Sequence, residues 1–246
     1  MSFERPIGPG AEPPPVPAGA GQAPSADASV ITPAMRLQIL STEHWSLLAS
    51  RSLAWNESFS RAGMFLSTLA GSIVALALVA QADNFGEGFR IFALVILPVV
   101  LLVGIGTNLR MGISNYHDAM CVIGMNRIRA AYVGIAPDLG RYFVMGTTDD
   151  QRGVSLTMAT QPETPLLVQM LASTPLLVTI LNGVLAAAII ALLVIQLGGA
   201  NGVAIALGIV GFAGTIAGFT WYARRDIARA IEEYKPLFPG PPETSP

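Results

Sequence analysis

Few side chains of this chain could carry acid–base or metal chemistry, and they are scattered along the sequence. The two histidines, His44 and His117, each stand next to a carboxylate, Glu43 and Asp118. Adjacent residues on a helix point about 100° apart, so neither pair forms a chelating face by itself. A site would need two helices to converge, and we expect the histidines to be surface or helix-packing residues.

A second candidate is the pair Asp149 and Asp150, which ends a Gly-Thr-Thr run and could bind a divalent cation together with loop carbonyls. The pair lacks the alternating spacing of a calcium-binding loop, so a solvated turn is the favoured interpretation. Cys121 is the only cysteine, which excludes an intramolecular disulfide and a cysteine-rich metal centre. We therefore assign no catalytic, cofactor-binding or metal-ligating residue.

Polar and aromatic residues outside the apolar stretches are better candidates for an interaction surface. Arg127 and Arg129 could contact phosphates or lipid headgroups, although membrane-proximal surface charge explains them as well. The formal net charge of −2 argues against a dedicated nucleic-acid binder, which normally has a basic face. The interaction candidates are Trp55, Asn126, Arg127, Arg129, Asp149 and Asp150.

Four uncharged apolar stretches must position these residues. Each holds about 20 residues, enough helix to cross a hydrocarbon core of roughly 30 Å. The whole chain is 52% hydrophobic and only 12% charged, so lipid must cover part of its surface. The sequence predicts an all-α, polytopic membrane protein built as two helical hairpins, with spans at about 64–82, 91–109, 175–197 and 202–222.

The basic residues predict the orientation of the spans. Of the 14 lysines and arginines, only Arg90 lies in the two short connections between spans. By the positive-inside rule, both termini and the long middle segment are therefore cytoplasmic. Residues 1–32 lack the apolar core of a signal peptide, so we expect insertion to begin with the first span. Arginine far outnumbers lysine, as is typical of GC-rich bacterial genomes, and this favours a bacterial inner membrane.

Further helices are predicted outside the spans. Thr32-Pro33 is typical of a helix N-cap and first turn, and the helix from there to Arg61 should run directly into the first span. Residues 110–136, ended by Pro137, and 224–234, ended by Pro236, should complete a cytoplasmic helical layer with 34–61. Thr-Pro recurs at Thr164-Pro165 and Thr174-Pro175, which predicts either a short helix in front of the third span or one helix that is kinked at Pro175.

The remaining segments are predicted to be less regular. Residues 1–32 are rich in proline and should form a disordered tail. Residues 137–173 should form loops and short elements, with strand-like content at 142–145 and 154–158 that fits a small hairpin or an ordered loop equally well. Residues 236–246 should form a polar tail that follows the hairpin unit 174–235.

Inside the spans, small and uncharged polar residues are the features of interest. No span contains an ionisable residue, which disfavours an ion-coupled transporter or a voltage sensor. Small residues four positions apart let helices approach closely, within one chain or between copies. For Asn182 we expect an interhelical hydrogen bond, with a pore- or substrate-facing amide as the alternative. The helix-packing or pore candidates are Gly63, Ser67, Gly71, Asn182, Gly208, Gly214 and Gly218.

Several short runs also carry a family resemblance: Thr-Glu-His-Trp-Ser-Leu-Leu-Ala at 42–49, Trp-Asn-Glu-Ser-Phe-Ser-Arg at 55–61 and Gly-Met-Asn-Arg-Ile-Arg at 124–129, with Ala136-Pro137 and Asp149-Asp150. Together they resemble a group of four-span integral membrane proteins of bacteria. The resemblance covers most of 34–235 and implies the same fold, with no assigned activity. A looser likeness to two-span bacterial effector domains thought to form pores is topological only.

These observations predict a non-enzymatic membrane protein, a self-associating scaffold or interaction module that presents its cytoplasmic helices to a partner and is surrounded by membrane lipids. An oligomeric channel is the alternative, with Ser67, Thr68 or Asn182 lining a path shared between copies. A lipid-active enzyme is a third class, and it would need a polar cluster to converge at the cytoplasmic rim. The residues for such a cluster are His44, Glu57, His117, Asp118, Asp149 and Asp150.

Overall fold

The structure, a computed structural model, describes residues 31–158 and 173–240. Every regular element within these ranges is helical, and no strand occurs in them. The predictions for most of the Pro-rich segment, for most of residues 159–173 and for the last residues of the polar tail fall outside the described ranges. The elements are α1 (Pro33–Asp83), α2 (Glu87–Ile135), η1 (Pro137–Tyr142), α3 (Gln151–Thr157), α5 (Thr174–Gln196) and α6 (Asn201–Glu233).

Helix α1 begins at the predicted cap. The Thr32 side chain accepts a hydrogen bond from the Met35 amide at 3.2 Å, and Pro33 occupies the first turn, where it has no N–H to lose. No proline follows inside the helix, and it continues for 51 residues. The predicted helix before the first span and the first span are therefore one continuous element.

Helix α2 is almost as long, and it joins the second predicted span to the helix predicted at residues 110–136. Pro98 lies inside it without ending it. The helix ends at Ile135, directly before Ala136-Pro137, because the residue before a proline is disfavoured in the helical conformation. Pro137 then starts the short 3-10 helix η1.

The hairpin considered for the middle segment is absent from its described part. Residues 154–158, with strand-like content, mostly belong to helix α3. The physical reason is local: the Asp150 carboxylate accepts a hydrogen bond from the Gly153 amide at 2.8 Å and so caps a helix there. Residues 142–145 have no partner strand among the described residues: Tyr142 ends η1, and residues 143–145 are irregular chain.

Helices α5 and α6 match the second predicted pair of spans. Ser173, rather than Thr174, is the N-cap of α5, and its hydroxyl accepts from the Leu176 amide at 3.4 Å. Helix α6 ends at Glu233, with Tyr234 as its C-cap, within one residue of the end predicted from Pro236.

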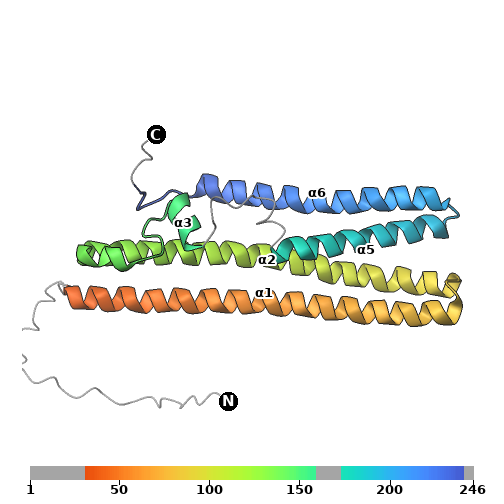
Figure 1. Ribbon diagram of the computed structural model, residues 1–246, viewed down its shortest axis with the longest axis horizontal. Helices are drawn as coiled ribbons and strands as arrows, with labels where there is room; N and C mark the ends of the chain where they lie inside the picture. The colour runs from red at the N-terminus through yellow and green to blue at the C-terminus, as the bar shows by residue number, and fades with distance from the viewer. Residues whose placement is uncertain (1–30, 159–172, 241–246) are drawn as a thin grey trace, which may run out of the picture.

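The four long helices pack as neighbours in chain order (Figure 1). Helix α1 packs along α2, α2 packs on α5, and α5 packs along α6. All four are long and apolar enough to cross a membrane. Residues 33–61 of α1 and 110–135 of α2 lie beyond the apolar stretches, and we call this pair the helical arm.

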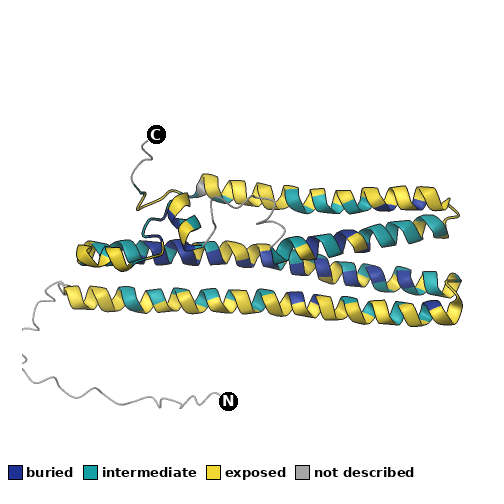
Figure 2. Ribbon diagram, in the orientation of Figure 1, coloured by how far each residue is buried: buried dark blue, intermediate teal, exposed yellow. Residues whose placement is uncertain are grey.

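Burial is concentrated in the middle of this arrangement (Figure 2). The core is formed by α1, α2 and α5, and its buried side chains include Phe65, which is fully buried, Leu97, Val100, Val178 and Leu185. The outer faces of α1 and α6 carry exposed apolar side chains, as expected of helices that face lipid or another protein.

Candidate functional site

The most densely hydrogen-bonded group in the described structure is the carboxylate of Asp149. Its Oδ2 accepts from Arg127 Nε at 2.8 Å, from the Tyr234 hydroxyl at 2.9 Å and from the Leu237 amide at 2.9 Å. Its Oδ1 accepts from the Phe238 amide at 2.8 Å, and the Asp149 amide donates to the Phe238 carbonyl at 3.2 Å. The side chain is 0% exposed. Asp149 therefore binds the segment that follows α6.

The electrostatics of Asp149 follow from these contacts. Burial alone would raise the pKa of the carboxyl, because it removes water from the charged form. The amides of Leu237 and Phe238, together with Arg127 and Tyr234, outweigh that effect and lower the pKa of Asp149 to about 2. The carboxylate is thus held ionised and compensated by its donors.

Asp150 also binds the segment that follows α6, a few residues further along the chain. Its Oδ2 accepts from the Gly240 amide at 2.7 Å, and its Oδ1 accepts from the Gly153 amide and from the Thr148 hydroxyl. The hydrogen bond from the Gly153 amide is the main reason that the pKa of Asp150 is lowered. A Cβ at Gly153 would collide with the Thr148 carbonyl, so the tight path of this loop requires a glycine there.

Asn126, on α2, binds the loop that precedes α3 and also binds α3 itself. Its amide donates to the Thr148 carbonyl at 2.8 Å, and its carbonyl accepts from the Thr157 hydroxyl at 2.7 Å and from Arg129 Nη1 at 2.8 Å. The Asn126 side chain is fully buried. Helix α2, the loop and α3 are thereby joined by side chains rather than by backbone pairing.

Five of the six interaction candidates thus lie in one cluster, which we call the tail clamp: Asn126, Arg127, Arg129, Asp149 and Asp150, bound to residues 234–240. The expectation of a solvated turn is wrong for Asp149, because the segment after α6 covers it and supplies donors in place of water. A cation would have to displace these donors. Within the described ranges, no group of three or more His, Cys, Asp or Glu side chains could hold a metal ion.

Trp55, the sixth candidate, lies in a separate polar contact within the helical arm. Its indole Nε1 donates to Asp118 Oδ1 at 3.0 Å, and Arg51 Nε donates to the same oxygen at 2.6 Å. In the same pair of helices, Glu57 accepts from Arg110 at 2.8 Å and from Arg61 at 3.0 Å. These bonds join α1 to α2 outside the apolar stretches.

The two histidines occupy different surroundings. His44 stacks on Tyr132 with ring centroids 6.1 Å apart, and burial, then the nearby Arg129, lowers its pKa. His117 Nε2 lies 3.7 Å from the Sγ of Cys121, one turn along α2. The residues considered for a lipid-active enzyme are therefore divided between the arm contacts and the tail clamp.

Asn182 has the opposite environment to Asp149. Its side chain is 0% exposed between α5 and α2, yet neither its Nδ2 nor its Oδ1 has a hydrogen-bond partner in the described residues. The expected interhelical hydrogen bond from Asn182 is therefore not found among the described residues. A Cβ at Gly104 would collide with Asn182 Oδ1 and would lie 2.7 Å from the Phe65 ring, so this amide packs directly against the α2 backbone.

A different asparagine makes the bond between these helices. Asn108 Nδ2 donates to the Thr179 hydroxyl at 2.6 Å and to the Pro175 carbonyl at 3.3 Å. The sequence offered a partial signal, a polar amide at the end of a predicted span. It did not show which residue of the third span would face it.

The small-residue candidates divide into covered and open positions. Gly208 packs on α5, where an added Cβ would lie 3.2 Å from the Ala187 carbonyl. By contrast, Gly63 and Gly71 on α1 and Gly214 and Gly218 on α6 would each meet no atom within 4 Å. Ser67 lies between the two α1 glycines and is also exposed. The α1 face Gly63-Ser67-Gly71 is called the open stripe below.

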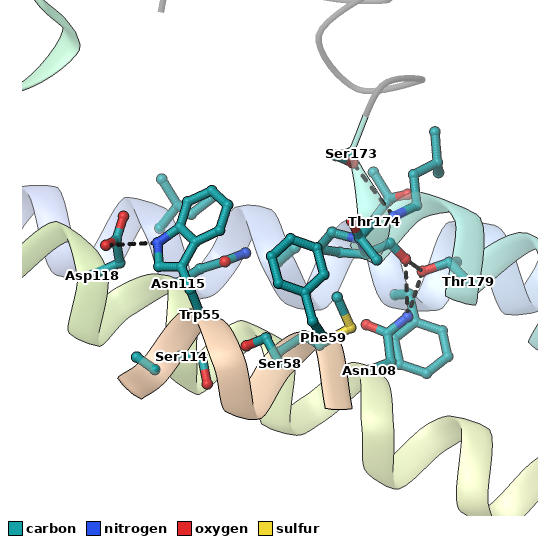
Figure 3. A pocket seen from close by; sticks show the side chains of 18 of the residues that line it. Trp55, Ser58, Phe59, Asn108, Ser114, Asn115, Asp118, Ser173, Thr174 and Thr179 are labelled. Atoms are coloured by element: carbon teal, nitrogen blue, oxygen red, sulfur yellow. Dashed lines mark hydrogen bonds between the residues drawn. The ribbon is translucent and has the colours of Figure 1, made fainter. Parts of the chain in front are cut away.

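A cavity of about 770 Å³ lies where the helical arm meets the apolar stretches. Trp55 and Asp118 mark one end of it and Asn108 and Thr179 the other (Figure 3). Its walls come from α1, α2, α5, α6 and the residue before α5. The volume is within the range of about 300–1,000 Å³ that is typical of small-molecule sites.

No family model, curated protein or solved structure matches this chain. The resemblance to four-span membrane proteins of bacteria stays a prediction.

Proposed function

We propose that this chain is a non-enzymatic, multi-pass membrane protein of the bacterial inner membrane that self-associates and presents its helical arm to a cytoplasmic partner. In this proposal α1 with α2 and α5 with α6 form two transmembrane hairpins, and both termini, the arm and the tail clamp are cytoplasmic. Four apolar helices and the asymmetric arginines support the orientation.

The observation that carries self-association is the open stripe. Within an apolar helix, small residues four positions apart let a second helix approach closely and gain van der Waals contact. In this chain the stripe Gly63-Ser67-Gly71 has no partner of its own among the described residues, whereas the comparable Gly208 is already covered by α5. A second copy supplies such a partner.

The helical arm supports the interaction role. Bonds from Arg51 and Trp55 to Asp118 hold its two helices together. Its outer face leaves Trp45 and Leu53 more than two-thirds exposed, at 68% and 69%. Exposed large apolar residues on a braced surface are typical of a protein-binding face.

Association can be tested with a matched pair of glycine substitutions. Donor- and acceptor-labelled protein in liposomes should give energy transfer that falls in Gly71→Leu, because leucine fills the open stripe. Gly106→Leu is the control, since Gly106 is also exposed on an apolar helix and also has open space around it. Equal energy transfer in all three proteins would contradict association through α1.

The orientation needs a separate test. In a Cys121→Ser background, we expect Asn201→Cys to react with a membrane-impermeant thiol reagent from outside the cell. Leu139→Cys, which is exposed on η1, should react only after lysis. The reverse pattern would overturn the proposed topology.

An oligomeric pore is the second candidate, and the exposed hydroxyls of Ser67 and Thr68 beside the open stripe favour it. Ion flux through liposomes separates the two proposals. The scaffold predicts no flux. Flux that Ser67→Leu reduces while association persists would favour the pore.

A further inference from the structure

The residues that line the cavity change from apolar to charged and polar along its length. Met111, Leu176 and Phe219 line its inner part, while Asp118 of the arm and Arg224 of α6 line its outer part. The polar amide at its inner end, Asn108, already donates to Thr179 and Pro175. The inner part is therefore chiefly apolar, and the outer part offers free polar groups.

The free charge of the cavity is positive. Asp118 is bound by Arg51 and by Trp55, so it has a compensating cation. Arg224, the other charged lining residue, has no hydrogen bond or ion pair with any described residue. Ser58 and Asn115 also line the cavity, and their side chains have no hydrogen-bond partner in the described ranges either.

An occupant that suits both parts is an anionic amphiphile. An apolar chain fits against Phe59, Met111 and Phe219, and a phosphate fits beside Arg224, where an arginine can donate two parallel hydrogen bonds. Trp221 and Tyr222 precede Arg224 on α6, and aromatic residues followed by arginines are typical of the headgroup level. This places the outer part of the cavity where lipid phosphates lie.

We propose that the cavity binds an anionic phospholipid of the cytoplasmic leaflet, with its phosphate at Arg224 and part of one acyl chain among Phe59, Met111 and Phe219. The proposal rests on the membrane insertion proposed above. It adds a specific lipid site to the protein and places that site against Trp55, at the base of the helical arm.

The three tryptophans of the chain allow a direct test. In Trp45→Phe/Trp221→Phe, the remaining Trp55 reports from the cavity wall. In Trp45→Phe/Trp55→Phe, the remaining Trp221 reports from the exposed face of α6. Each full-length protein is reconstituted in two kinds of phosphatidylcholine vesicle. One contains phosphatidylglycerol brominated in the acyl chain, and the other contains phosphatidylcholine brominated in the acyl chain at the same mole fraction.

We expect the bromolipid to quench Trp55 with about a fivefold preference in relative affinity for phosphatidylglycerol, the ratio that corresponds to one arginine near an anionic surface, about 1 kcal/mol. Arg224→Gln should remove this preference, and Arg224→Lys should keep most of it. Arg225→Gln is the matched control, because Arg225 is the adjacent exposed arginine and lies outside the cavity wall. Trp221 should be quenched by both lipids.

Three results would overturn the site: quenching of Trp55 with no headgroup preference, a preference that survives Arg224→Gln, or no quenching of Trp55 while Trp221 is quenched. The last result would mean that protein rather than lipid fills the cavity. No quenching at Trp221 would instead overturn membrane insertion, on which both proposals rest.

Discussion

Asp149 and Asn182 are both completely buried, and their surroundings differ as much as two polar side chains can. Asp149 is charged and accepts four hydrogen bonds from the segment after α6 and from Arg127. Asn182 is neutral, lies among apolar helices and has no partner in the described residues. A buried polar group costs stability unless its hydrogen bonds are replaced. The tail clamp replaces them all, and the Asn182 site replaces none.

The difference indicates that hydrogen bonds position one part of the chain and that side-chain packing positions the other. The tail clamp positions the end of α6 by directional bonds, so it tolerates little change in partner. Around Asn182 the helices are positioned by shape, with Gly104 leaving room for the amide and the Phe65 ring packed next to Gly104. Polar substitutions should therefore matter most at the clamp and volume changes most between the helices.

The largest effect is expected at the clamp. Asp149→Ala leaves Arg127, the Tyr234 hydroxyl and two backbone amides without their acceptor, and loss of this buried carboxylate should cost about 3 kcal/mol. The amides of Leu237 and Phe238 should then exchange with solvent deuterium at least about a hundredfold faster. Asp138→Ala is the control, because Asp138 is an exposed carboxylate on η1. Unchanged protection in Asp149→Ala would show that the clamp does not hold the tail.

A smaller effect is expected where shape positions the helices. Gly104→Ala should lower the stability of the protein in micelles by about 1–3 kcal/mol, because the new methyl group overlaps Asn182 Oδ1 and approaches Phe65. Gly106→Ala, two residues away and open, should be near neutral. Adding Asn182→Ala to Gly104→Ala should restore part of the loss, and additive losses would mean that the two residues do not touch.

The charge of Asp149 gives the clamp a pH dependence. Its pKa falls from an ordinary 3.8 to about 2 in the folded protein. The carboxylate therefore stabilises the folded state by about 2 kcal/mol above about pH 4, and this contribution is lost as the pH falls toward 2. The amide chemical shifts of Leu237 and Phe238 should stay constant down to about pH 4 and change below it. Release of the tail already near pH 5 would contradict the lowered pKa.

The contrast between the two regions also separates what the sequence predicts from what it does not. Thr32-Pro33 and Pro137 predict helix boundaries because capping and proline geometry act within a few residues. Arg127 and Asp149 are 22 positions apart, and Asp149 and Tyr234 are 85 apart. Their convergence depends on where the end of α6 lies relative to α2 and the loop before α3, which no local pattern contains.

Polar residues within the spans are difficult to pair from the sequence for a related reason. The rule that a buried amide needs a partner predicts that some asparagine bridges the helices, and one does, namely Asn108 rather than Asn182. The choice between them depends on the rotation of α5 against α2. Helical periodicity cannot determine that rotation when nearly every residue of a span is apolar.

Leucine at these two asparagines should change the free energy of unfolding in opposite directions, and both changes should be small. Asn182→Leu removes an amide with no partner and keeps a similar volume, so we expect a gain of about 1 kcal/mol in the free energy of unfolding. Asn108→Leu removes the bonds to Thr179 and Pro175 and should lose about as much. Thermal unfolding of both variants in the same micelles measures the difference. A loss in Asn182→Leu equal to that in Asn108→Leu would mean that the buried amide is hydrogen-bonded in the membrane. The tail clamp and the α2–α5 contact would then follow one rule, in which a buried polar group is paired by hydrogen bonds.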